Sequence, residues 1–184
     1  MAELQLIFVV ETSADDKTDN IYLRSVLDYF FTSISKEYGC EVNIKPIFLN
    51  GKQHYKDKKV LNNIVNQTRM FASYNDGAIT KTIYIMDTDS VNKAYEVGSF
   101  FYNVQQFCVE HNFELVWFCK NAENVFLGKE VDQIDNKTEA AKSFAKNNDI
   151  ERLDRNCLSK NEIEYRCSNI LSIVGKYLKE KKNQ

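Results

Sequence analysis

The sequence predicts an α/β fold built on a mainly parallel, four-stranded sheet with helices on both faces. Apolar segments of strand length alternate along the chain with segments whose apolar residues recur at helical spacing. The first strand segment, residues 4–10, is almost continuously apolar, which is typical of a strand buried on both faces. Right-handed crossovers through the intervening helices are therefore expected to join parallel strands.

Four strands are expected, and their positions set the order of the fold. They cover residues 4–10, 42–49, 82–87 and 113–119. The second strand is interrupted by Pro46. Because proline has no amide hydrogen to donate, this strand is expected at an edge of the sheet.

Helices are expected between the strands and after the last one. The three crossover helices are predicted over residues 21–38, 56–71 and 92–111, and Gly39 marks the end of the first. Capping-box patterns at 136–139 and 159–162 each predict a further helix, the second of which continues to Leu178.

One domain is expected from this order of elements. We expect residues 1–128 to form an α/β core and residues 129–184 a helical C-terminal extension packed on the same domain. The region 128–159 is the least regular and is interpreted as an insertion or a lid.

Composition narrows the class of protein. The chain has 184 residues, of which 43% are hydrophobic, and a formal net charge of −2, so the overall field does not attract nucleic acid or acidic membranes. Five widely spaced cysteines without a CxxC pair suit a reduced, cytoplasmic chain. The N-terminus does not have the pattern of a signal peptide, and no apolar run approaches the ~18 residues of a membrane span.

Acidic residues follow three of the predicted strands. Glu11 closes the first strand, Asp87 and Asp89 close the third, and Glu123 follows the fourth. Because the carboxyl ends of parallel strands meet at one edge, where ligands bind in open α/β sheets, these acids are expected to lie together. If the third strand persists to Asp89, both aspartates point the same way and can address one Mg²⁺ or Mn²⁺ ion.

A structural interpretation of the aspartates stays open. Asp89 or Ser90 is also a plausible N-cap of the helix that follows. Thr18 or Asp19 is likewise a plausible N-cap of the helix predicted over residues 21–38. Other chemistry has little support, because the sequence has no GxGxxG, GxxxxGK[ST] or GxSxG motif. His54 and His111 fall in a polar turn and at a helix end, where solvation is the simpler interpretation.

The strand that ends in Val9-Val10-Glu11 and the one that ends in Ile85-Met86-Asp87-Thr88-Asp89 together resemble the TOPRIM domain of topoisomerases, primases and OLD-type nucleases. The segment 120–127, Lys-Asn-Ala-Glu-Asn-Val-Phe-Leu, is similar to the segment after the fourth strand in small RloB-like TOPRIM proteins of phage-defence systems. The resemblance covers residues 4–128 and implies a Rossmann-like, TOPRIM-type fold.

The resemblance also implies an activity, metal-dependent phosphodiester cleavage by a nuclease-like hydrolase of phage defence. It makes Glu11, Asp87 and Asp89 the ligands of Mg²⁺ or Mn²⁺, with Glu11 also a candidate general base and Glu123 a further ligand or base. Nucleic acid would be bound through the metal, and a protein partner such as an ATPase fits the family, although no feature of the sequence identifies one. The sequence does not indicate whether the substrate is DNA, RNA or a nucleotide, nor the oligomeric state.

Two other functions are compatible with the same acids. In a receiver-like phosphoacceptor, Asp15 and Asp16 would hold Mg²⁺, Asp87 would accept the phosphoryl group and Lys120 would neutralise it. In a non-catalytic interaction module the site would be vestigial. Thr12, which stands where TOPRIM proteins usually have glycine, favours this third hypothesis.

Overall fold

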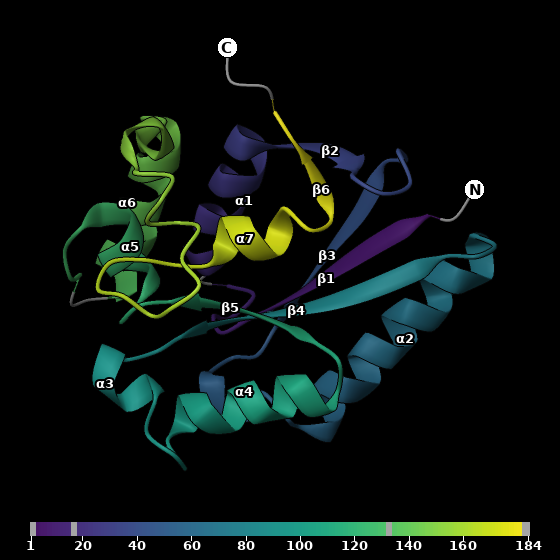
Figure 1. The fold of residues 1–184 in the computed structure, drawn as a ribbon, viewed down its shortest axis with the longest axis horizontal. Helices are drawn as coiled ribbons and strands as arrows, with labels where there is room; N and C mark the ends of the chain where they lie inside the picture. Colours follow the sequence, from purple (N-terminus) through teal and green to yellow (C-terminus); the bar gives the residue numbers. More distant parts are fainter. Residues whose placement is uncertain (1–2, 16–17, 132–133, 182–184) are drawn as a thin grey trace.

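A four-stranded, all-parallel sheet forms the centre of the protein (Figure 1). The computed structural model describes residues 3–15, 18–131 and 134–181. The strand order is β3-β1-β4-β5. These strands are β1 (Leu4–Val10), β3 (Val42–Phe48), β4 (Ile79–Asp87) and β5 (Glu114–Phe118). The predicted α/β class is therefore confirmed, and β3, which contains Pro46, lies at an edge of the sheet as expected.

The central strand β1 is buried along its whole length and pairs in parallel with both β3 and β4. Its one polar side chain, Gln5, donates to Asn43 Oδ1 at 3.4 Å and accepts from Thr80 Oγ1 at 3.1 Å. Because both polar ends of Gln5 have partners, its burial does not leave an unsatisfied amide in the core. The near-continuous apolar run thus reflects a strand with no solvent-exposed face.

Helices cover both faces of the sheet, as Figure 1 shows. One face carries α2 (Lys58–Tyr74), α3 (Val91–Ala94) and α4 (Phe100–Glu110), together with the short 3₁₀ helix η1 (Lys52–His54). The other face carries α1 (Thr18–Phe30), α5 (Ala122–Leu127), α6 (Ile134–Lys146), η2 (Asp149–Arg152) and α7 (Ile170–Val174). None of the described helices is both long enough and apolar enough to cross a bilayer.

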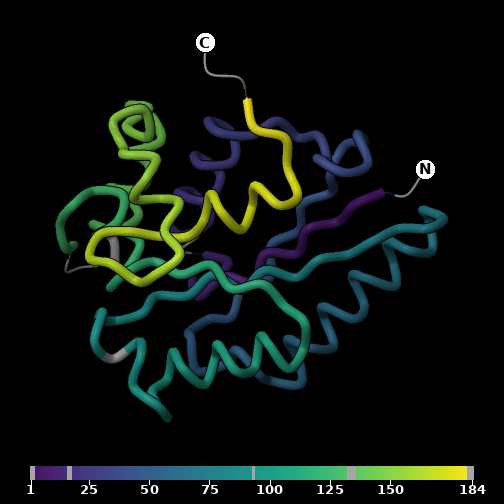
Figure 2. The backbone as a smooth tube through the Cα atoms, viewed as in Figure 1, coloured from purple at the N-terminus to yellow at the C-terminus, as the bar shows by residue number. Residues whose placement is uncertain are grey.

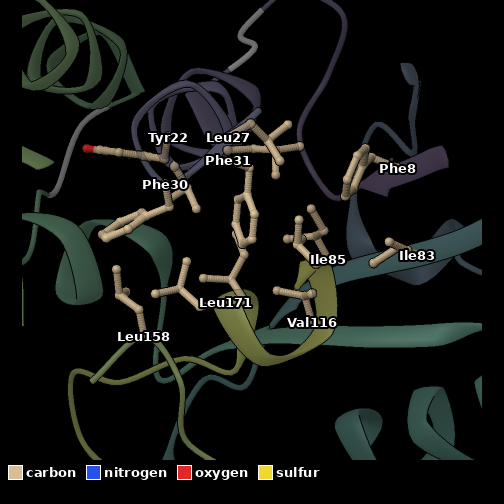
Figure 3. Close-up of a cluster of buried hydrophobic side chains, with 14 of the residues drawn as sticks. Phe8, Tyr22, Leu27, Phe30, Phe31, Ile83, Ile85, Val116, Leu158 and Leu171 are labelled. Atoms are coloured by element: carbon tan, nitrogen blue, oxygen red, sulfur yellow. The ribbon is translucent and has the colours of Figure 1, made fainter. Parts of the chain in front are cut away.

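Alternate side chains along the central strands belong to two separate apolar cores, one on each face of the sheet. Phe8 of β1 and Ile85 of β4 join the core beneath α1, where Figure 3 shows them beside Leu27, Phe31 and Leu171. Their neighbours along the strands point to the opposite face and pack beneath α2 and α4. This two-sided alternation follows from the period of two along a strand.

The first crossover helix is shorter than predicted. It ends at Phe30, and the chain continues as β2 (Phe31–Ser35), which pairs antiparallel with β6 (Leu178–Glu180). Figure 2 shows the C-terminal chain returning to lie beside this early segment. Helical spacing alone could not reveal the distant partner strand that makes an extended conformation favourable here. Gly39, with φ of 67°, serves the turn after β2 rather than the end of a helix.

The helix predicted over residues 159–178 is wrong, and the one predicted over 92–111 is divided. Residues 159–169 form an irregular segment along β5, followed by the short α7 and β6. In the second case Ser99 starts a new helix, α4, by accepting a hydrogen bond from the amide of Tyr102 at 3.1 Å.

Asn169 explains why the late segment is not helical. Its Oδ1 accepts from the Trp117 amide and its Nδ2 donates to the Leu115 carbonyl, each at 2.9 Å. The side chain thereby forms hydrogen bonds with backbone groups at the edge of β5, where the described part of the chain has no neighbouring strand to pair with them. The irregular backbone is held in place by these contacts with the sheet.

Removal of the Asn169 side chain is expected to destabilise the protein. Asn169→Ala should lower the free energy of unfolding by about 2 kcal/mol, because the buried Trp117 amide loses its acceptor. Urea unfolding measures this change. The matched control is Asn66→Ala, at an exposed position of α2, which should change stability by no more than about 0.5 kcal/mol. Equal effects of the two substitutions would contradict the structural role of Asn169.

Candidate functional site

The carboxyl edge of the sheet brings Glu11 and Asp87 together. Val10 of β1 is aligned with Ile85 of β4, so the residues that follow these positions leave the sheet side by side. The Asp87 amide donates to Glu11 Oε2 at 3.5 Å. Glu11 is also fixed through its backbone, since its carbonyl accepts from the amide of Gly51 at 3.0 Å.

Asp89 lies at the rim of this group. β4 ends at Asp87, and Asp89 adopts a left-handed conformation with φ of 60°. The expectation that Asp87 and Asp89 point the same way along a continuing strand is therefore wrong. The Asp89 side chain is 52% exposed and forms an ion pair with Lys52, while its amide donates to the Lys120 carbonyl at 3.2 Å.

Glu123 approaches the same edge from α5. Asn121 caps this helix by accepting from the Asn124 amide at 2.8 Å, which places Glu123 in the first helical turn. The Glu123 side chain is only 4% exposed, and its Oε2 lies 3.6 Å from Nζ of Lys137, on α6. The ion pair compensates part of the cost of burying this carboxylate.

Asp19 and Lys137 belong to the site and were not predicted as such from the sequence. Asp19 lies in the first turn of α1 and is buried, close enough to Asp87 to raise its pKa. A signal was present, because Asp19 falls three residues before Tyr22, on the stripe that packs against the core. An acid at a buried helical position suggests a role beyond capping.

The electrostatic result is that two carboxyl groups of this site, Asp87 and Glu11, resist ionisation. The pKa of Asp87 is well above its usual range, first because of burial and then because of the nearby charges of Asp19, Glu11 and Glu123, while Lys137 opposes the shift. Burial also raises the pKa of Glu11, against the opposing charge of Lys52. Buried like charges of this kind store free energy that a bound cation can release.

Three buried side-chain oxygens in the described part of the chain have no hydrogen-bond partner, and two of them belong to residues that directly follow Glu11 and Glu123 in the chain. They are Thr12 Oγ1, Tyr22 OH and Asn124 Oδ1. Tyr22 lies close enough to Glu123 and Asp19 for both charges, after burial, to raise its pKa, and in Figure 3 its hydroxyl points away from the apolar cluster. Unsatisfied buried groups of this kind are expected where a protein binds an ion, water or ligand.

The donor set suits a hard divalent cation, although it is not closed around one. Across residues 3–15, 18–131 and 134–181, no three His, Cys, Asp or Glu side chains are already arranged as a metal-ligand group. The carboxylates of Asp89 and Glu123 are instead paired with lysines. Glu11, Asp19, Asp87 and Glu123 nevertheless offer the oxygen ligands that Mg²⁺ and Mn²⁺ prefer.

The fold and the site define a class, an α/β protein with a parallel sheet and an acidic group at its carboxyl edge. No protein-family model matches the sequence, and no curated protein is similar to it at a significant level.

The raised pKa values predict how stability depends on pH. Above the ordinary carboxyl pKa of about 4, the folded protein keeps protons on Asp87 and Glu11 that the unfolded chain has released, so the free energy of unfolding falls as the pH rises. Asp87→Asn removes the most strongly shifted group. It should make the protein more stable near neutral pH and flatten the fall in stability that begins above the ordinary carboxyl pKa of about 4, measured by thermal unfolding with a chelator.

The matched control is Asp76→Asn, which removes the same charge from an exposed turn. This variant should keep the pH dependence of the wild type. If stability falls as steeply with rising pH in Asp87→Asn as in the wild type, the raised pKa of Asp87 is not the cause of the pH dependence.

Proposed function

We propose that the protein is a Mg²⁺- or Mn²⁺-dependent, nuclease-like enzyme that cleaves phosphodiester bonds. The observation that carries this proposal is the group of carboxylates at the carboxyl edge of a parallel sheet, with the pKa of Asp87 well above its usual range because of burial and then of the charges of Asp19, Glu11 and Glu123. Strained, desolvated acids in this position are more typical of a functional site than of helix capping. The TOPRIM resemblance of residues 4–128 favours the same chemistry.

Each acid has a role that its position supports. Asp87 and Glu11 lie at the centre and would hold the metal, and Asp19 and Glu123 approach from the two helices that cover the site. A bound metal would supply Lewis-acid chemistry, polarising the phosphoryl oxygen and lowering the pKa of an attacking water. Glu11, partly exposed beside Asp87, is placed to accept the proton from that water.

Two lysines supply positive charge around the acids. Lys52 pairs with Asp89 and lies 5.3 Å from the centre of the Phe100 ring, and Lys137 lies next to Glu123. Both ammonium groups are partly accessible. They balance the carboxylates in the free protein and are placed to contact the phosphate of a substrate once a metal neutralises the acids.

Divalent metal should stabilise the folded protein. At a concentration about 100 times its Kd, Mg²⁺ or Mn²⁺ should add about 2.7 kcal/mol to the free energy of unfolding. For a chain of this size that corresponds to a rise of about 5–10 °C in the unfolding midpoint. Thermal unfolding with chelator and with each metal measures the rise, which should be lost in Asp87→Asn and kept in Asp76→Asn. A rise that is equal in both variants would place the metal elsewhere.

Phosphodiester cleavage should depend on Glu11. With Mn²⁺, the wild type should cleave a labelled single- or double-stranded oligonucleotide, and Glu11→Gln should lower the rate by at least about 100-fold, because the proton acceptor is lost. Gel separation of the products measures the rate, and Asp76→Asn is again the control. Metal binding without cleavage of DNA or RNA would contradict the proposed activity while keeping the metal site. Absence of both would favour the interaction module.

A further inference from the structure

The segment from Cys157 to Ser168 forms a loop whose two ends are joined directly. The Ser168 amide donates to the Cys157 carbonyl at 2.7 Å, and the Lys160 amide donates to the Ser168 carbonyl at 3.0 Å. Ser168 also donates through its hydroxyl to the Trp117 carbonyl at 2.7 Å, so the closed loop is fastened to β5. The backbone at both ends is thus held in one arrangement.

This closure brings two cysteines close together. The first hydrogen bond joins the carbonyl of Cys157 to the residue directly after Cys167, so the two cysteines lie at the closed end of the loop, and both belong to the same apolar cluster. Both side chains pack in the core beneath α4. Burial, and then a hydrogen bond from its thiol to Cys157, raise the pKa of Cys167 to about 12. Both cysteines are free thiols, and the backbone hydrogen bond between Cys157 and Ser168 brings the two residues close together.

The two thiols differ in their access to solvent. Cys167 is 3% exposed, whereas Cys157 is half-buried and its Sγ lies 3.8 Å from Asp154 Oδ2 near the surface. A small oxidant can therefore reach Cys157 first. The more deeply buried Cys167 would then act as the resolving thiol, which reacts with the oxidised Cys157. An accessible cysteine close to a buried resolving cysteine is the usual arrangement of a reversible thiol-oxidation site.

We propose that Cys157 and Cys167 form a thiol-oxidation site that closes a reversible intramolecular disulfide when it meets a low-molecular-weight disulfide such as oxidised glutathione. The Cys157 thiolate attacks one glutathione sulfur, a mixed disulfide forms and one glutathione thiolate leaves. Cys167 then loses its proton to solvent as its sulfur attacks Cys157 Sγ, and the second glutathione leaves as a thiolate that takes up a proton. The protein loses two electrons and the two thiol protons, and one glutathione disulfide becomes two glutathione thiols.

The cross-link would fix a segment next to the acidic edge of the sheet. The Cys167 carbonyl accepts from the Cys119 amide at 3.0 Å, and the next residue, Lys120, donates to Thr88 Oγ1 at 3.0 Å and accepts from Asp89. The disulfide therefore restrains the chain where β5 ends. Its formation does not depend on the proposed metal chemistry.

Oxidation of the full-length protein with oxidised glutathione, followed by peptide mapping under non-reducing conditions, tests this site. The wild type should lose two free thiols, yield a peptide that joins Cys157 to Cys167, and regain both thiols with dithiothreitol. Its unfolding midpoint should rise on oxidation, because a bond between these positions restricts the unfolded chain.

Three variants make the outcome decisive. Cys157→Ser and Cys167→Ser should each abolish the joined peptide, and Cys40→Ser, a partly buried cysteine in the turn after β2, should keep it. Cys157→Ser should disturb folding less than Cys167→Ser, because the Cys157 side chain is half-buried and the Cys167 side chain is buried. A wild-type protein that keeps glutathione bound at Cys157, or that loses no thiols, would overturn the proposal.

Discussion

The structure depends on one strand that has no exposed face. β1 is buried along all seven residues and has parallel neighbours on both sides, so helices must cover both faces of the sheet. A parallel sheet also sends every strand out of the core at the same edge. The residues that follow β1, β4 and β5 are therefore forced together, and here these residues include acids. The position of the candidate site follows from burial of the apolar strand, before any ligand is considered.

The negative charge of the acids at this edge is partly balanced by lysines from other parts of the chain. Lys52 enters from the turn after β3, and Lys137 enters from α6 in the C-terminal extension. α6 is itself anchored on α1, where Thr18 Oγ1 and Thr138 Oγ1 lie 3.4 Å apart. The extension thus contributes to both the core and the charge balance of the site. Since ion pairs offset only part of the cost of desolvating charges, the pKa of Asp87 stays raised despite Lys137.

The sequence predicted the parallel sheet and where its strands end, because apolar runs and the acids after them are local signals. It did not predict β2, β6 or the irregular path along β5, since these depend on contacts between distant segments. Asn169 shows the difference well: its side chain acts as a strand partner for β5, and no periodic pattern reports that. Asp19 was missed for a related reason. A capping role explained it locally, and only the packing of α1 placed it beside Asp87.

The raised pKa of Asp87 connects stability to the proposed chemistry. At neutral pH the free protein either keeps a proton on this half-buried group or accepts repulsion among its carboxylates, and both states are costly. A divalent cation would displace the proton and remove the repulsion, so metal binding should release protons and bind more weakly as the pH falls. Protein segments that only cap helices would not keep such strain together with the three unsatisfied oxygens of Thr12, Tyr22 and Asn124. The raised pKa values of the neighbouring Asp87 and Glu11 are the physical reason for preferring a binding site to a set of caps.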